Sequence, residues 1–218
     1  MSTQGFYNRF AAFYPFVDFF LSMHKGILNE ELNALPAGRL LEVGVGNGSN
    51  LKWMQKHQLT GIDTSFGMLI RARKKVDRME AGYLRAHPKM SIDKDAAIQK
   101  YVNVHLAEMS GEQMTFQDES FDYIVLSHVL AVTRNPDRML GECYRVLKPG
   151  GQLLILNHFT PRNWFGFVDK LVKPVGKALH FRSVFNIESI PNTRKFRLVK
   201  ERAASGPGYF KLMIYTKD

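Results

Sequence analysis

Three alternating glycines are the part of this sequence best suited to chemistry. In the stretch LLEVGVGNGSNL, Gly44, Gly46 and Gly48 follow an apolar run, so the backbone can turn tightly and approach a ligand closely. A dinucleotide fingerprint G-x-G-x-x-G would require glycine at position 49, where the chain has Ser49. The spacing instead reads E-x-G-x-G-x-G and begins at Glu42. The pattern predicts a ligand-binding turn, with a purely structural turn as the alternative.

An acidic residue follows at the end of the next apolar run. The carboxylate of Asp63 could accept hydrogen bonds from both hydroxyls of a ribose, as an acidic residue does in dinucleotide enzymes. The alternative is that Asp63 caps the helix that follows, although Thr64 or Ser65 could also fill that role. Taken with the glycines, Asp63 favours a site for a nucleoside.

Alternating strands and helices are predicted to position these residues. A helical region over residues 6–32 should break at Pro15. Further helices are expected after the glycine turn, from Ser65 onward, and from Pro136 to residues 148–151. Apolar runs predict strands at 39–43, 59–63, 101–107, 121–129, 151–157, 196–201 and 209–217, the last two antiparallel. This order specifies an α/β doubly wound sheet, in which ligands bind beyond the carboxyl ends of the strands.

Composition limits the class of protein and its partners. The 218 residues suit a single domain, and polar residues 84–100 look like an insertion. A net charge of +10 points to an anionic partner. The single cysteine, Cys143, fits a reducing compartment and is expected to be a buried, inert thiol. No segment approaches the ~20 apolar residues of a membrane span, so we expect a cytoplasmic protein.

Four motifs in order resemble the class I S-adenosylmethionine (SAM)-dependent methyltransferases. They are LLEVGVGNGSNL, GIDTSFGMLIRAR, FDYIVLSHVL and RVLKPGGQLLIL, within about residues 37–157. The resemblance implies a Rossmann-like, seven-stranded, mostly parallel sheet with an antiparallel last strand. It divides one domain into an N-terminal aromatic helical lid (1–36), a cofactor-binding core (37–157), and a basic aromatic segment with a C-terminal hairpin (158–218).

The resemblance also implies cofactor contacts. The glycines would surround the methionine portion of SAM, Asp63 would bind the ribose, and Met68 would lie at the adenine. The family usually has an acidic residue after its third strand, where this chain has Ser110, with Met109 beside it and Glu108 as an alternative. The full predicted cofactor set is Tyr7, Glu42, Gly44, Gly46, Gly48, Asp63, Thr64, Met68, Met109, Ser110 and Ser127.

Other segments bear on the substrate. Ser127-His128-Val129-Leu130 stands where enzymes that methylate base amines often carry N-P-P-Y, which argues against a nucleic-acid substrate. SHVLAVTRNPDRML, LNHF, HFRSVF and GPGYFKLMIY are similar to the bacterial phosphatidylethanolamine N-methyltransferases, over nearly the whole chain. An ornithine-lipid N-methyltransferase would look much the same. YNRFAAFY resembles the start of methyltransferases that act on hydrophobic substrates, so a quinone-type C-methyltransferase is also an alternative.

Methyl transfer to a lipid amine would need a base rather than a metal. The ammonium must lose a proton before it attacks, and His128 and His158 follow the fourth and fifth predicted strands at the expected edge. Tyr14 could hold the nitrogen by its hydroxyl or by cation–π attraction. A structural role is the alternative for each of these residues. No cluster with metal-ligand spacing is present, so we expect no metal.

The basic aromatic segment at residues 157–181 is predicted to contact a membrane. Its aromatic side chains suit the depth of lipid headgroups, and its cations suit an anionic surface. The expected contact residues are Arg162, Trp164, Phe165, Lys170, Lys173 and Lys177. The alternative is an aliphatic face packed on the sheet with solvated lysines. We therefore expect a peripheral membrane protein that acts on an aminophospholipid; its oligomeric state stays open.

Overall fold

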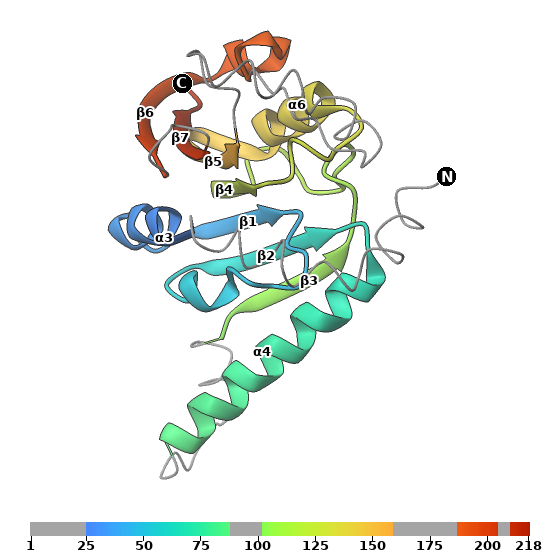
Figure 1. Cartoon of the computed structure of the whole chain (residues 1–218), viewed down its shortest axis with the longest axis vertical. Coiled ribbons are helices and arrows are strands. Elements are labelled where there is room, and N and C mark those ends of the chain that lie inside the picture. Colours follow the sequence, from blue (N-terminus) through green and yellow to red (C-terminus); the bar gives the residue numbers. More distant parts are fainter. Residues whose placement is uncertain (1–24, 88–101, 159–186, 205–209) are drawn as a thin grey trace, which may run out of the picture.

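The computed structural model contains one seven-stranded sheet, and it describes residues 25–87, 102–158, 187–204 and 210–218. The strand order is β3-β2-β1-β4-β5-β7-β6 (Figure 1). The first five strands run parallel, whereas β7 is antiparallel to both β5 and β6. The strands are β1 (Arg39–Val43), β2 (Gln58–Asp63), β3 (Val104–Glu108), β4 (Phe121–Ser127), β5 (Leu147–His158), β6 (Arg197–Ala203) and β7 (Phe210–Thr216). The Rossmann-like fold predicted from the sequence is confirmed.

Helices cover both faces of the sheet. They are α3 (Lys25–Ala34), α4 (Phe66–Ala86) and α6 (Pro136–Val146), together with the short 3-10 helices η1 (Leu51–Trp53), η2 (Ile187–Ser189) and η3 (Pro191–Lys195). Successive residues of a strand face opposite sides of a sheet, so in a doubly covered sheet both sets are apolar. In β5, Leu153 and Ile155 join the core that contains α6, whereas Leu154 and Leu156 join the core that contains α3 and α4.

The segment after the glycine turn differs from the prediction of a helix. It forms only the single 3-10 turn η1. Three glycines with positive φ occupy much of the connection, and β2 already begins at Gln58. The Asn50 side chain, which would otherwise be placed to cap a helix, instead donates through Nδ2 to Oε1 of buried Glu42 over 2.6 Å.

Other boundaries were predicted to within a few residues. Helix α4 begins as expected, because the Ser65 hydroxyl accepts a hydrogen bond from the Met68 amide. Strand β4 ends at Ser127 rather than at residue 129, since His128 has a φ of 59°. Helix α6 ends at Val146, and β5 begins at Leu147, earlier than residue 151. The predicted terminal hairpin is confirmed by β6 and β7.

The remaining predictions concern segments that the structure describes in part or not at all. The predicted N-terminal helical region falls largely outside the described residues, which begin with α3 at Lys25. Most of the polar stretch 84–100 and nearly all of the basic aromatic segment also lie outside them. Within the described ranges, no helix is long and apolar enough to cross a membrane.

Candidate functional site

The glycine turn is held against β2 and β4 by its backbone. The amides of Gly44 and Val45 both donate to the Ile62 carbonyl oxygen, over 2.8 and 3.0 Å. Gly44 and Gly48 each have a φ of 73°, which strongly favours glycine. A Cβ at Gly44 would lie 2.8 Å from Cγ2 of Val129, the residue that follows the end of β4 by two positions. The turn therefore packs directly against the segment after β4.

The carboxylate of Asp63 joins the turn to the end of β2. Its Oδ2 accepts a hydrogen bond from the Gly46 amide over 2.9 Å, and its Oδ1 accepts one from the Ser65 amide over 2.8 Å. Burial raises the pKa of Asp63 above its ordinary value, although these backbone hydrogen bonds oppose the shift. A carboxylate has about four acceptor positions, so it can also accept bonds from ligand hydroxyls. Ser65, not Asp63, supplies the N-cap of α4.

The residues predicted to border the adenine lie beside the end of β2. The Met109 amide donates to the Asp63 backbone carbonyl oxygen over 3.1 Å, so the residue after β3 lies beside the end of β2. The Ser110 hydroxyl accepts a hydrogen bond from the Glu112 amide over 3.2 Å and begins a tight turn. Glu108 is exposed, and Met68, in the first turn of α4, is partly buried. Glu108 pairs directly with Asp63 across β2 and β3, so Glu108, Met109 and Ser110 all follow the same edge of the sheet.

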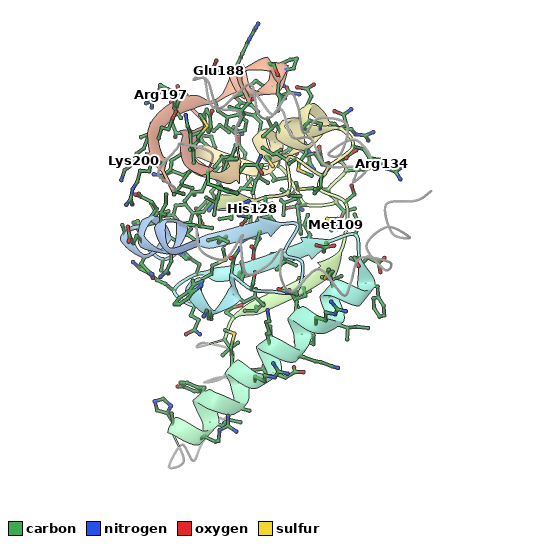
Figure 2. All side chains as sticks on the ribbon, in the orientation of Figure 1. Met109, His128, Arg134, Glu188, Arg197 and Lys200 are labelled. Carbon is green, nitrogen blue, oxygen red and sulfur yellow. The ribbon has the colours of Figure 1, made fainter. Side chains whose placement is uncertain are left out.

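Strand β4 ends in a buried polar residue and a histidine with unusual backbone geometry. No described residue hydrogen-bonds the buried Ser127 hydroxyl. The His128 amide donates to the Leu156 carbonyl oxygen over 2.8 Å, and its φ of 59° is a conformation in which histidine is enriched. The His128 ring lies edge-on to Phe210, with centroids 5.8 Å apart. Figure 2 shows His128 and Met109 apart from Arg197 and Lys200, which lie on β6.

Two buried asparagines were not identified from the sequence. The Asn50 side chain donates a hydrogen bond to the carboxylate of Glu42, and both side chains are buried. This bond joins the two ends of the glycine turn. Asn157 is 1% exposed and lies one residue before the end of β5, where it pairs with Lys211 of β7. A polar residue that ends the apolar run QLLIL was the available sequence signal. Asn157 lies beside the end of β4, because its neighbour Leu156 pairs with Ser127.

Eight predicted site residues lie outside the described residues, and a ninth is described only in its backbone. His158 ends β5 and pairs with Phe210, but the structure does not describe its side chain. The eight are Tyr7, Tyr14, Arg162, Trp164, Phe165, Lys170, Lys173 and Lys177. Across the described ranges, no three or more His, Cys, Asp or Glu side chains are grouped as metal ligands would be.

The geometry fits a nucleoside with an amino-acid tail. The glycine turn permits close approach, Asp63 can accept hydroxyl donors, and the Ser127 hydroxyl is available to a polar ligand group.

A family model described as a methyltransferase domain matches residues 41–155. The chain belongs to the SAM-dependent methyltransferases. SAM is the cofactor of this methyltransferase, and the sequence expectation of family, enzyme class and cofactor is confirmed.

Similar proteins extend this result beyond the family core. A phosphatidylethanolamine N-methyltransferase of Cereibacter sphaeroides is 30% identical over 182 residues, which cover 83% of this chain and 80% of that protein. A ubiquinone/menaquinone biosynthesis C-methyltransferase of Psychromonas ingrahamii is 36% identical over 85 residues, 39% of this chain and 30% of that protein. The crystal structure of a SAM-dependent methyltransferase from Thermotoga maritima shares the fold, with a TM-score of 0.62, 20% identity and full coverage of both chains.

Proposed function

We propose that this methyltransferase transfers methyl groups to the amino headgroup of phosphatidylethanolamine and its methylated intermediates at a membrane surface. The observation that carries the proposal is the 30% identity to a phosphatidylethanolamine N-methyltransferase over 83% of this chain. That alignment covers much more than the residues 41–155 of the shared domain, so it includes sequence outside the cofactor-binding core. The resemblance of the later motifs to the same enzymes supports it.

The quinone-type alternative rests on a shorter match. The C-methyltransferase of Psychromonas ingrahamii aligns over only 39% of this chain. An alignment of 85 residues is shorter than the 115-residue span 41–155 of the methyltransferase domain. A match of that size is explained by a common cofactor site, so it favours a quinone substrate less than the longer alignment favours a phospholipid.

The described residues support an assignment of each part of the cofactor. When bound, SAM would supply a methyl group from its sulfonium to the amine nitrogen, and the neutral thioether S-adenosylhomocysteine would leave. We assign the ribose to Asp63, and the amino-acid tail to the glycine turn and the Ser127 hydroxyl. Met109 and Ser110 would border the adenine. The residues Tyr7, Glu42, Thr64 and Met68 remain predicted cofactor contacts.

We assign the proton transfer to the end of β4. A lipid ammonium must become neutral before its nitrogen can attack, so a base at the reacting edge raises the rate. His128 follows β4 at that edge, and its ring faces Phe210 at the start of β7. His158 and Tyr14 remain alternatives for holding or deprotonating the amine. Membrane contact by the basic aromatic segment is part of the proposal.

The decisive experiment measures the transfer of labelled methyl groups from SAM to defined acceptors. Phosphatidylethanolamine, an ornithine lipid and a quinol would be presented in the same detergent micelles. We expect label in phosphatidylethanolamine and its methylated products. Label confined to the quinol, or to the ornithine lipid, would refute the headgroup assignment.

His128→Asn tests the base in the same assay. Asparagine tolerates positive φ, so this substitution removes the imidazole with little backbone strain. We expect kcat to fall about 100-fold, within the usual contribution of a general base, with SAM affinity largely kept. Unchanged kcat would move the role to His158 or Tyr14.

A further inference from the structure

Helix α4 carries two kinds of side chain that neither the fold nor the cofactor site uses. Its inner side is defined by buried Leu69, Ala72 and Val76, which pack in the core that also contains α3. Its outer side carries four exposed cations, and its first turns carry two exposed apolar residues. The four cations, named here the α4 basic stripe, are Arg71, Lys74, Arg78 and Arg85.

Helical periodicity places the stripe on one side of the helix, turned away from the sheet. The intervals between its members are three, four and seven residues, which repeat on one face of an α-helix. At about 100° per residue, the stripe centres roughly opposite the side of Leu69, Ala72 and Val76. Figure 1 shows the C-terminal half of α4 projecting beyond the sheet.

Among the residues that the structure describes, the acids of α4 do not neutralise the stripe. Both acids of α4 interact with Arg73, which is not part of the stripe. Asp77 lies 2.9 Å and Glu80 lies 3.7 Å from the Arg73 guanidinium. No ion pair among the described residues engages any member of the stripe. The chain as a whole has a net charge of +10, so its field reinforces the attraction of these four cations for an anionic surface.

Two exposed apolar side chains lie on the flank of the stripe, at the end of α4 nearest the cofactor site. Phe66 is 62% exposed and Ile70 is 44% exposed, one turn apart. Phe66 stands only three residues after Asp63, so this pair lies at the edge of the sheet where the site opens. An aromatic and an aliphatic side chain beside a row of cations are the features that hold an amphipathic helix at a lipid surface.

We propose that the outer side of α4 docks on the surface of an anionic phospholipid bilayer, with the basic stripe on the headgroups and Phe66 and Ile70 at the boundary with the acyl chains. The proposal rests on the proposed function, because a lipid substrate gives the enzyme reason to lie there. The helix of 21 residues is about 32 Å long, so it can lie along the surface. The mouth of the site would then open beside the bilayer.

The test compares two variants of equal charge. In the α4 variant, Arg71, Lys74, Arg78 and Arg85 are all changed to Gln, a residue that keeps high helix propensity. In the control, four exposed cations of α6, η3 and β6 are changed to Gln: Arg138, Arg194, Lys195 and Arg197. Each variant lowers the net charge from +10 to +6, a loss of four. In Figure 1, α6 and the edge strand β6 lie at the opposite end of the sheet from α4.

Binding is measured by sedimentation of the full chain with phosphatidylcholine vesicles, with and without phosphatidylglycerol. We expect the α4 variant to lose at least about tenfold in partitioning to the anionic vesicles, because each basic residue at such a surface contributes several-fold. The control should bind as the unmodified protein does. Phe66→Gln/Ile70→Gln should weaken binding even at high salt, which screens charges. Circular dichroism and thermal melts establish that each variant is folded.

Three outcomes would overturn the proposal. Equal losses in the two charge variants would mean that binding follows net charge, and unchanged binding of the α4 variant would place the contact elsewhere. Preferential binding of a DNA duplex over vesicles, lost in the α4 variant, would make nucleic acid the occupant. Methyl transfer to phosphatidylethanolamine in micelles is measured separately, so failure of the proposed function and failure of this docking surface give different results.

Discussion

At the residue scale, Asp63 connects the glycine turn with two other segments at the end of β2. Its carboxylate accepts bonds from the amides of Gly46 and Ser65, and its backbone oxygen accepts one from Met109. The carboxylate thus links the glycine turn to the start of α4, and the backbone of the same residue links them to the loop after β3. Loss of this carboxylate should affect SAM far more than it affects global stability, because the backbone bonds to Ile62 would remain.

We expect Asp63→Ala to weaken SAM binding by at least about tenfold, equivalent to ~1.4 kcal/mol. Isothermal titration calorimetry measures the dissociation constant directly. Asp77→Ala is the matched control, since Asp77 is an exposed acid of α4 that pairs only with Arg73 in its vicinity. An equal dissociation constant in Asp63→Ala and the unmodified protein would contradict the ribose assignment.

At the element scale, α6 fixes the loop between β3 and β4 that borders the predicted adenine site. The guanidinium of Arg145 donates to the carbonyl oxygens of Met114 and Phe116 over 2.9 and 2.7 Å. It also pairs with Asp118 and Glu142, and the hydrogen bond from Arg145 is the main cause that lowers the pKa of Glu142. Two residues earlier, Cys143 is fully buried in the apolar core, as the sequence predicted.

Arg145→Met should lower the free energy of unfolding by about 2 kcal/mol, because it breaks charge-assisted bonds and leaves a partly buried carboxylate without its partner. Urea denaturation measures the change. Arg73→Met removes a guanidinium from an exposed pair on α4, so it should cost no more than about 0.5 kcal/mol. If the two substitutions cost the same, the loop is not held by Arg145.

At the scale of the whole molecule, the C-terminal hairpin is joined to the first described helix by ion pairs. Glu31 of α3 accepts from Lys200 and Arg202 of β6, each over 2.7 Å. Burial by itself would raise the pKa of Glu31, but the hydrogen bonds from Lys200 and Arg202 outweigh it, and the pKa lies below its ordinary value. A carboxyl whose pKa is lowered by folding adds stability above its unfolded pKa, and that stability disappears as the pH falls.

Glu31→Gln should therefore destabilise the protein at neutral pH, by on the order of 1 kcal/mol for a largely surface ion pair. The difference from the unmodified protein should shrink as the pH falls from the ordinary pKa of a glutamate, about 4.3, through the lower pKa that Glu31 has in the folded protein. Thermal unfolding at a series of pH values measures this difference. A difference that stays constant with pH would mean that Glu31 contributes packing rather than charge.

The sequence by itself determined the sheet and the position of the turn, whereas the cofactor was implied by the resemblance to a known family. Those features depend on local signals: short apolar runs, glycines at alternate positions, and Ser65 and Pro136 at helix starts. The helix predicted after the turn was wrong. The Asn50 side chain hydrogen-bonds Glu42 of β1 and does not cap a helix. Hydrogen bonds between distant segments have no local pattern, so the role of Asn50 could not be recognised in advance, and the only signal for Asn157 was its place at the end of an apolar run.

Only the tertiary structure decided which side chains share the site and which surface remains free. Asp63, Met109 and the end of β4 lie far apart in the chain, and parallel strand pairing brings them to one edge. The cations of α4 were visible in the sequence, but the sequence did not show which of them face away from the sheet. Burial of Leu69, Ala72 and Val76 settled that point, because a helix packed on one side must turn its remaining charges outward.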